Sequence, residues 1–361
     1  MMQILFRIPV YTSFTPEGIP VYGFGMMLFI AFIVCTWLAG KRAVAKGIDA
    51  QIVHDLSVWI FVAGLLGART LFLYEQKLTL TEFLMNFPRI WDGGIILYGS
   101  VLGGTLGFFA YWFMVLRPKG IEPLLVIDIL APSVALGIAI GRIGCLMNGC
   151  CFGQIVEPSQ PAIAIYFPLA APARYDLVRA GLQTATGFTF SENQKGQGAV
   201  VGKVEPDSAA KKAGIAEGDI IIEAEGQMVK NPFDLGMILN NDWPRGKKTL
   251  QLKIQGKQEL ILQPHGLGLH PAQLYETMSM ALLLFFLLSF EPFQTRVGQL
   301  TAILMMFYAM HRFLNELLRS DPRPVSLESN VSLFLFLAGA LLLAYLQWKG
   351  TRVSNTAPVV V

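Results

Sequence analysis

The chain of 361 residues is 53% hydrophobic and only 15% charged, and its mean hydropathy is +0.51. In soluble globular proteins about a quarter of the residues are charged, so this composition excludes the ordinary soluble class and indicates an integral membrane protein. The formal net charge of +3 is too small to indicate a nucleic-acid-binding protein.

Seven apolar segments are each long enough to cross a bilayer as a helix, since about 20 apolar residues span its hydrocarbon core. They cover residues 21–39, 53–72, 94–116, 124–142, 273–290, 297–317 and 331–348. The first one follows no basic stretch and ends at Lys41-Arg42, so we expect a membrane helix there and not a cleavable signal peptide. The sequence therefore predicts a polytopic α-helical membrane protein with seven spans.

Lysines and arginines in the short loops predict the orientation, because such loops are more basic on the cytoplasmic side. One face collects Lys41, Arg42, Lys46, Arg117, Lys119, Arg296, Lys349 and Arg352. We therefore expect the N-terminus outside the cell membrane and the C-terminus in the cytoplasm. Four arginines oppose this rule on the outer side, namely Arg142, Arg312, Arg319 and Arg323. Binding of an anionic group would explain their position.

Residues 154–269 separate the fourth and fifth spans and are too long for a connecting loop, so we expect a folded domain there. Within them, residues 196–264 show a strand, a short helix, a Gly-Asp turn, a strand, a helix and a strand hairpin. The segment AGIAEGDIII at 213–222 is the most specific part, and Gly218-Asp219 supplies its turn. This order resembles a PDZ domain of the type found in bacterial envelope proteases, which implies peptide binding at a sheet edge.

The predicted organisation has five parts. They are a first membrane half with four spans (1–153), a periplasmic cap segment (154–195), a PDZ-like domain (196–264), a second membrane half with three spans (265–350) and a cytoplasmic tail (351–361). The fold class is thus a helical membrane bundle interrupted by a small α/β-type domain. In the cap segment, we expect Arg174 and Arg179 to be exposed basic residues.

Polar and glycine-rich motifs accompany the apolar segments in both membrane halves. In chain order they read VYGFGMM (21–27), GLLGARTLF (64–72), GGIILYGSVLGG (93–104), GRIGCLMNGCCFG (141–153), HPAQLYE (270–276) and YAMHRFLNELLR (308–319). Ionisable groups at the edge of hydrocarbon are costly, so in a membrane protein they mark a functional site. Together, these motifs resemble the prolipoprotein diacylglyceryl transferase family over residues 21–153 and 270–348.

The resemblance implies an enzyme of the bacterial cytoplasmic (inner) membrane. Such an enzyme transfers diacylglyceryl from phosphatidylglycerol to the lipobox cysteine of a prolipoprotein and releases glycerol phosphate. The implied partners are phosphatidylglycerol, prolipoprotein signal peptides and a peptide ligand of the PDZ-like domain, with no cofactor and no metal. An alternative is a homologue that has lost catalysis and serves as an envelope scaffold through its PDZ-like domain. The sequence has no H-E-x-x-H motif, which argues against an intramembrane protease.

Arg142 and Arg312 are the candidate catalytic residues that bind phosphate. Arginine grips a phosphodiester through a planar pair of N–H groups, and both residues end a span on the outer side. Membrane-interface anchoring is the alternative for Arg142. For Arg312, the alternative is an ion pair with Glu316, which lies four residues further along the same helix.

The proton acceptor for the incoming thiol is left open by the sequence, although the thiolate is the nucleophile. Many members of the family carry histidine where this chain has Tyr98, and a phenol with an ordinary pKa of about 10 is a poor base. We therefore expect Tyr98 to position the lipid at the catalytic site. His270 and His311 are the remaining candidates on the outer side, but His270 is equally suited to capping and packing a helix.

The resemblance also implies a set of substrate-binding residues. They are Tyr22, Arg69, Asn148, Gly153, Tyr308 and Glu316. The two tyrosines are equally suited to anchoring at the membrane interface. The asparagine is equally suited to capping a turn.

Three clustered cysteines depart from the family pattern. Cys145 and Cys150 stand where asparagine and an acidic residue are common, and Cys151 follows directly. We expect packing or a local disulfide, which the oxidising outer side permits. A metal site would need further ligands at suitable spacing.

Overall fold

The computed structural model describes most of the chain. The described residues are 4–11, 18–88, 96–157, 161–167, 171–180, 182–183, 186–194, 196–206, 208–241, 249–263, 266–320 and 325–349. The chain forms two compact units. The first contains Met1–Met27, Gly141–Met278 and Phe313–Ser329, and the second contains Leu28–Ile140, Ser279–Arg312 and Asn330–Val361.

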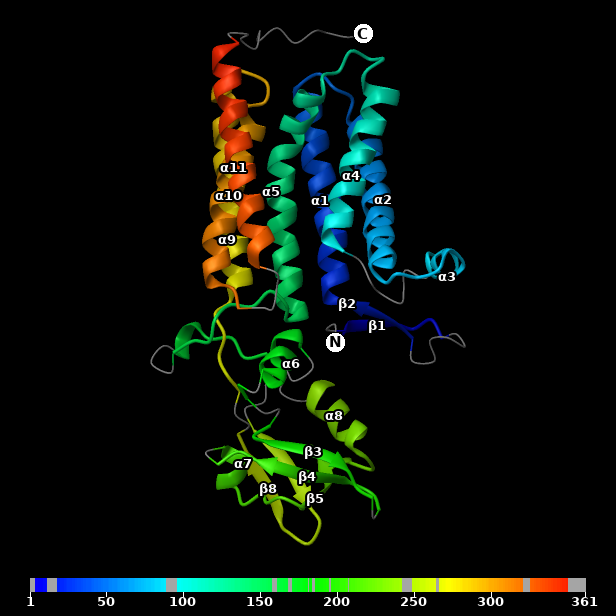
Figure 1. The fold of residues 1–361 in the computed structure, drawn as a ribbon, viewed down its shortest axis with the longest axis vertical. Coiled ribbons are helices and arrows are strands. Elements are labelled where there is room, and N and C mark those ends of the chain that lie inside the picture. The colour runs from blue at the N-terminus through cyan, green and yellow to red at the C-terminus, as the bar shows by residue number, and fades with distance from the viewer. Residues whose placement is uncertain are drawn as a thin grey trace. The chain divides into compact units, whose positions relative to one another are not determined.

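The apolar segments form long helices, as Figure 1 shows. They are α1 Gly23–Ala45, α2 Ala50–Glu75, α4 Leu97–Tyr111 continued by the π-helical turn η2 Trp112–Leu116, α5 Pro123–Asn148, α9 Ala272–Phe290, α10 Gln299–Leu318 and α11 Val325–Trp348. Within the described part of the chain, six segments are long and apolar enough to cross a membrane. They are Gly23–Ala45, Ala50–Glu75, Tyr98–Leu116, Pro123–Asn148, Ala272–Phe293 and Asn330–Trp348.

The helix α10 occupies the predicted sixth span but is not one of these six segments. His311, Arg312, Asn315 and Glu316 lie in its last two turns and lower its hydropathy. A short helix, α3 Leu80–Asn86, follows α2 and begins with a capping box between Thr79 and Glu82.

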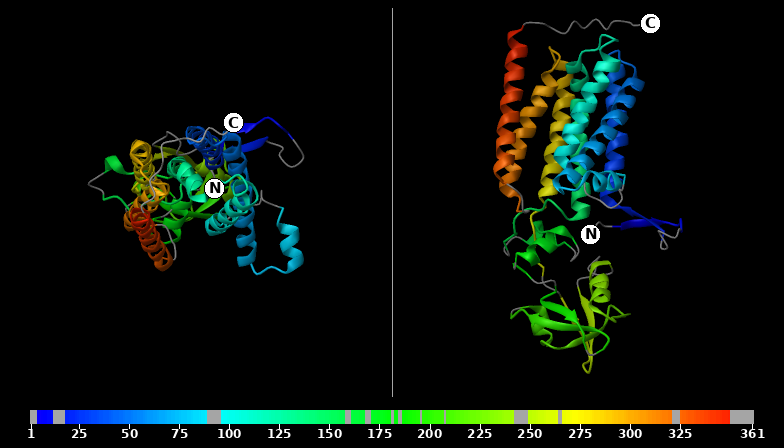
Figure 2. Two further views of the ribbon diagram at one scale, coloured as in Figure 1. Left: turned by 90° about the horizontal axis from the view of Figure 1, so that it is seen from above. Right: turned by 45° about the vertical axis from the view of Figure 1, so that its right-hand side comes forward.

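Glycines bring α2 and α4 into backbone contact in the second unit, where the two helices lie side by side (Figures 1 and 2). A Cβ atom on Gly103 would overlap the carbonyl oxygen of Ala63 and lie 3.0 Å from the Gly67 Cα. A Cβ on Gly67 would in turn lie 2.8 Å from the Gly103 Cα. Small residues at such positions let membrane helices approach closely, so these glycines set the packing distance.

The buried carboxylate of Asp128 joins α5 to the start of α10, also in the second unit. It accepts hydrogen bonds from the backbone N–H groups of Gly298 and Thr301, the Thr301 hydroxyl and the side chain of Gln294. Asp128 is only 2% exposed. A buried carboxylate is tolerated only with such a full set of donors, so this cluster fixes the ends of both helices.

Arg42 lies inside α1, which corrects its assignment to a short loop. Its Nε and Nη2 atoms each lie 3.0 Å from a carboxylate oxygen of Glu291, in the turn η4 Glu291–Phe293 after α9. The guanidinium also donates to the backbone carbonyls of Asp128 and Ile129. Arg42 thus has a structural role in addition to any influence on orientation.

The first unit opens with a β-hairpin that the sequence analysis did not predict. Strands β1 Ile4–Ile8 and β2 Ile19–Tyr22 pair antiparallel, and β2 leads directly into α1. The predicted cap segment contains the short turn η3 Pro161–Ile163 and the helix α6 Pro172–Arg179. Phe152, Phe167, Leu177 and Leu269 form a small apolar core there.

Arg174 is buried in this cap, which overturns the expectation that it is an exposed basic residue. It is 5% exposed and its Nη1 donates to the Phe167 carbonyl oxygen at 3.3 Å. Burial lowers the pKa of its guanidinium. Arg179, at the end of α6, is exposed as expected.

A six-stranded antiparallel sheet forms the folded insert. The strands are β3 Phe188–Glu192, β4 Ala199–Val204, β5 Ile220–Ala224, β6 Gln227–Met228, β7 Leu250–Ile254 and β8 Glu259–Leu262, and the helices are α7 Ala209–Lys212 and α8 Pro232–Asn241. The sheet order is β3-β4-β5-β7-β8, with β6 paired to β5. Its first strand begins eight residues before the boundary predicted at 196.

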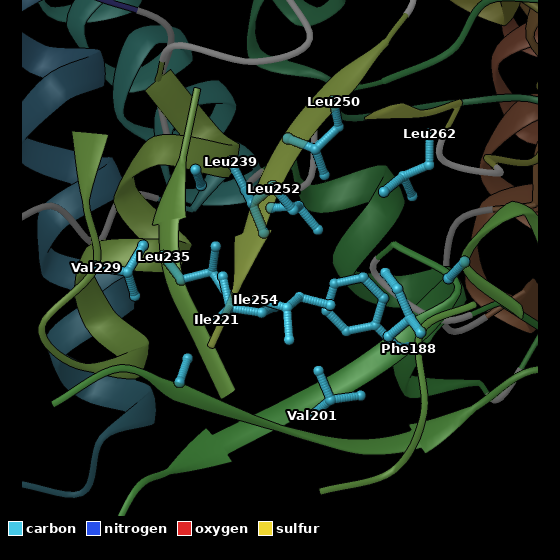
Figure 3. Close-up of a cluster of buried hydrophobic side chains, with 14 of the residues drawn as sticks. Phe188, Val201, Ile221, Val229, Leu235, Leu239, Leu250, Leu252, Ile254 and Leu262 are labelled. Carbon is cyan, nitrogen blue, oxygen red and sulfur yellow. The ribbon is translucent and has the colours of Figure 1, made fainter. Parts of the chain in front are cut away.

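Alternation of apolar and polar residues builds the core of this sheet. Leu250, Leu252 and Ile254 of β7 point inward, while the residues between them are exposed. Figure 3 shows the ring of Phe188 meeting Val201 and other strand side chains in the interior. The predicted turn before β5 is present, because Gly218 has a φ of 88° and the Ala216 N–H donates to the Asp219 carboxylate at 2.9 Å.

We predict that Gly103→Ala destabilises the protein whereas Gly104→Ala does not. Both changes raise helix propensity on α4 by the same amount, of about 1 kcal/mol. A Cβ at Gly104 would lie 3.5 Å from Ile60 Cγ2, which is an ordinary contact, whereas one at Gly103 overlaps backbone. The thermal unfolding midpoint of Gly103→Ala in detergent should be lower than that of Gly104→Ala by at least about 2 °C. Equal midpoints would contradict the close contact.

Candidate active site

Arg142 and Glu276 form a buried ion pair between α5 and α9. The helix α5 continues to Asn148, six residues beyond Arg142, so the first part of the GRIG motif is helical and not a loop after the span. The Arg142 Nε lies 2.9 Å from Glu276 Oε1. The Glu276 side chain is 1% exposed and that of Arg142 is 15% exposed. The carboxylate therefore fixes the guanidinium at the end of an apolar helix.

Asn315 adds a third helix to this cluster. Its Nδ2 donates to Glu276 Oε2 at 2.7 Å, and the asparagine is 3% exposed. One carboxylate of α9 thus forms an ion pair with a residue of α5 and accepts a hydrogen bond from a residue of α10. Such a buried charge is stable only when both oxygens have partners, so the three side chains depend on one another.

Glu276 and Asn315 were missing from the site residues expected from the sequence. Glu276 ends the HPAQLYE motif and lies in an apolar helix, where a carboxylate is costly. That cost is a signal that could have identified it. The sequence offers no comparable signal for Asn315, because its partner lies 39 residues away along the chain.

The chain after α5 turns sharply back toward α9. Gly149 has a φ of 72°, and a Cβ on it would lie 2.6 Å from Ala171 Cβ, so only glycine fits this turn. The Cys150 N–H donates to the Cys145 carbonyl at 3.1 Å, which closes the last helical turn. Gln273 of α9 donates its Nε2 to the Cys150 carbonyl at 2.6 Å and holds the turn in place.

Gly153 and His270 lie together in a short backbone ladder. The Gly153 N–H donates to the His270 carbonyl at 3.0 Å, and the His270 N–H donates to the Gln154 carbonyl at 2.9 Å. A Cβ on Gly153 would be 2.7 Å from His270 Cβ, which explains the glycine. The His270 carbonyl caps α9 through the Ala272 N–H, while its ring Nδ1 lies 3.1 Å from the Tyr275 hydroxyl.

A cavity of about 780 Å³ adjoins this ladder in the first unit. Gly153, Gln154 and Leu269 line one part of it. Asp176 and Arg179 of α6 add charged groups to its wall. A cavity of this volume with a few polar groups is of the size that holds a small ligand or part of a lipid.

The three cysteines of the motif converge at the same turn. Their sulfur atoms all lie within 4.8 Å of one another, and all three thiols are free. Hydrogen bonds from the thiols of Cys145 and Cys150 lower the pKa of the Cys151 thiol. The positive charges of Arg319 and Arg142 lower it further.

The other residues expected at the site are distributed over both units. In the first unit, Tyr22 ends β2 with 37% exposure and Glu316 is half-buried on α10. In the second unit are Arg69, Tyr98, Tyr308 and Arg312. Arg69 is buried and its Nη2 donates to the Asn86 carbonyl at 2.7 Å, while Tyr98 opens α4 with 49% exposure. Tyr308 packs against the apolar core between α5, α9 and α10.

Two of the expected features lie outside the described residues. Gly93 and Gly94 of the glycine-rich motif are not among the described residues, and neither is Arg323.

The fold and the site define a class of protein, namely a multi-pass membrane protein with a buried arginine–carboxylate cluster at the end of its helices. Comparison with known proteins gives the family. The family model described as prolipoprotein diacylglyceryl transferase matches residues 9–345. The chain therefore belongs to the prolipoprotein diacylglyceryl transferase family, and with its apolar helices this indicates a multi-pass inner-membrane protein.

Individual relatives carry the name phosphatidylglycerol–prolipoprotein diacylglyceryl transferase. The protein from Rhodopirellula baltica is 34% identical over 223 residues, which cover 59% of this chain and 44% of that protein. The one from Clostridium tetani is 27% identical over 153 residues, covering 42% and 57%. The one from Synechocystis sp. is 30% identical over 169 residues, covering 46% and 56%. The chain spans about half the length of these relatives.

We predict that Arg142 and Glu276 are energetically coupled. Removing one partner of a buried ion pair leaves the other charge unpaired, at a cost of about 3–5 kcal/mol. In a cycle of Arg142→Gln, Glu276→Gln and the double variant, the double variant should lose less unfolding free energy than the two single losses combined, by about 1 kcal/mol or more. The same cycle with Arg179→Gln in place of Arg142→Gln should be additive. Additivity in both cycles would contradict the pair.

Proposed function

We propose that the protein transfers diacylglyceryl from phosphatidylglycerol to the lipobox cysteine thiol of prolipoproteins. The observation that carries this proposal is the family match over residues 9–345 combined with the buried Arg142–Glu276 pair. In the reaction, the cysteine sulfur forms a bond to the diacylglycerol carbon that carries the phosphate ester. The bond between that carbon and the ester oxygen breaks, the head group leaves as glycerol phosphate, and the thiol proton passes to a base.

Arg142 is proposed to hold the phosphate of phosphatidylglycerol. Glu276 occupies the Nε edge of its guanidinium, so the terminal nitrogens are the part that would meet an anion. The carboxylate and Asn315 keep the group oriented before the lipid arrives. Donors that are already oriented stabilise a developing negative charge without a further reorganisation cost.

Arg312 is proposed as the second phosphate-binding group, and the remaining substrate contacts follow the family motifs. It lies on α10, three residues before Asn315, with Glu316 one turn further on. The proposed substrate-binding residues are Tyr22, Arg69, Asn148, Gly153, Tyr308 and Glu316. In this assignment, Glu316 serves to orient the arginine.

We expect Arg312→Ala to lower the rate of transfer at least about tenfold, because a charged hydrogen bond contributes about 1.5–3 kcal/mol. The assay measures diacylglyceryl transfer from labelled phosphatidylglycerol to a lipobox peptide. Arg312→Lys should restore little activity, because a point charge does not reproduce the planar pair of donors. Arg117→Lys, at an exposed arginine after η2, is the matched control and should leave the rate unchanged. Full activity of Arg312→Lys would assign a structural charge to this position, and inactivity of the unaltered chain would refute the transferase function.

His270 is proposed as the proton acceptor and Tyr98 as a lipid-positioning residue. The Tyr275 hydroxyl at Nδ1 holds the His270 ring in one orientation, which suits a base. Tyr98→Phe should then lower the rate without changing its pH dependence, and Tyr98→His should be tolerated. His270→Gln should remove the acid limb of the pH–rate profile, since that limb reports the essential base. Loss of the acid limb in Tyr98→Phe instead would identify the tyrosine as the base.

The full topology is proposed to have seven spans, with α10 as the sixth, the N-terminus and the insert in the periplasm, and the C-terminus in the cytoplasm. The uneven distribution of basic residues in the short loops supports this orientation. One polar group of α10, the Asn315 side chain, donates to Glu276 and so has a protein partner in place of hydrocarbon. In a background in which the four native cysteines are replaced by serine, a membrane-impermeant thiol reagent applied to intact spheroplasts should label Lys230→Cys in the insert but not Lys349→Cys. The reverse pattern would refute the orientation.

The sheet of β3 to β8 is proposed to be a PDZ-like, peptide-binding insert between two membrane halves. Its strand β3 is a terminal strand of the sheet, and α8 packs on the same core. A terminal strand offers unpaired backbone groups to an added peptide. Because the family motifs resume at His270, replacing residues 188–262 by a Gly/Ser linker should leave transfer measurable. Complete loss of transfer in a monodisperse variant would place the insert in the catalytic machinery.

A further inference from the structure

The three thiols of Cys145, Cys150 and Cys151 are unusually concentrated. All three sulfur atoms lie within 4.8 Å of one another at the turn that follows α5. Zinc is held tetrahedrally by sulfur ligands at about 2.3 Å, which places neighbouring sulfurs about 3.8 Å apart. The observed cluster needs only small side-chain adjustments to reach this arrangement.

The backbone conformation at Cys151 places its thiol close to those of Cys145 and Cys150. Cys151 has a φ of 59°, which is a left-handed backbone conformation that residues other than glycine rarely adopt. Strained backbone of this kind is retained where the surrounding structure requires a particular side-chain position. Here Gln273 fixes the Cys150 carbonyl and the Gly153–His270 ladder fixes the chain just after Cys151. The cluster is therefore held by contacts from α9 and not by the cysteines alone.

The charges around the cluster suit a metal bound by thiolates. Three thiolates and one Zn²⁺ carry a combined charge of about −1. The positive charges of Arg319 and Arg142 act on Cys151, and Arg142 is already matched by Glu276.

We propose that Cys145, Cys150 and Cys151 form a binding site for a thiophilic metal ion of the Zn²⁺ class. Three protein ligands leave a fourth position for water or another exogenous ligand, as in zinc sites of the open type. This inference concerns metal binding alone and does not depend on the transferase function. It replaces the disulfide or packing role expected from the sequence.

The test is a titration of the full-length, reduced and chelator-treated protein in detergent with Co²⁺, followed by Zn²⁺. We expect one Co²⁺ per chain with an intense thiolate-to-metal charge-transfer band, displacement of Co²⁺ by Zn²⁺, and no response to Mg²⁺. Bound Zn²⁺ should also protect three of the four cysteines from a thiol-modifying reagent.

Each single change Cys145→Ser, Cys150→Ser or Cys151→Ser should weaken Co²⁺ binding at least about tenfold. Cys35→Ser is the matched control and should bind Co²⁺ normally, because Cys35 is not a member of the cluster and its thiol on α1 donates to the Ser133 carbonyl of α5. Size-exclusion profiles identify any variant that fails to fold, and the protection assay on the unaltered protein needs no variant. Binding without the charge-transfer band, equal affinity in all variants, or unprotected thiols at saturating Zn²⁺ would each overturn the proposal.

Discussion

The buried carboxylate of Glu276 is the constraint on which the site depends. A carboxylate that is 1% exposed has lost its hydration and is stable only through protein partners. Arg142 of α5 and Asn315 of α10 supply them, so the ends of three helices are fixed around one charge. The guanidinium is oriented by this requirement before any ligand is present. The contacts that stabilise the ends of these helices are therefore the same contacts that orient the guanidinium.

The membrane helices and the β-sheet insert are stabilised by different interactions. Lipid is as apolar as the helices themselves, so helices in a membrane associate through close packing and polar contacts. The α2–α4 glycines and the hydrogen-bonded Asp128 show both. The β-sheet insert instead encloses Phe188 and its apolar neighbours, as expected for a domain that folds in water. The two parts should accordingly respond differently to denaturants and to changes of detergent.

The sequence was sufficient for elements whose signal is local. Long apolar runs located the helices, and alternating residues with a Gly-Asp turn located β4, β5, β7 and β8 but not the two-residue strand β6. The strand β3 was missed because, of its five residues, only Phe188 is buried. The hairpin of β1 and β2 was missed for a similar reason, since its apolar residues are largely exposed.

Long-range pairing could not be predicted from one sequence. Arg42 lies 249 residues from Glu291, and nothing near either residue indicates the other. The sequence around Arg174 predicted a solvated cation, whereas in the structure its guanidinium is buried and donates to the Phe167 carbonyl. The convergence of three cysteines likewise depends on the left-handed backbone at Cys151, which no residue pattern indicates. The sequence motifs marked candidate residues, whereas the partners of those residues became visible only in the structure.

The contact between α2 and α4 also has a mechanical consequence. Where backbone meets backbone at Gly67 and Gly103, no flexible side chain can absorb a displacement of one helix along the other. Displacement of one helix along the other would instead press main-chain atoms against main-chain atoms, because the Cβ positions of Gly67, Gly99 and Gly103 already lie against the backbone of the facing helix. A rearrangement of this unit would therefore move these two helices together as one rigid element and take up the motion at their ends.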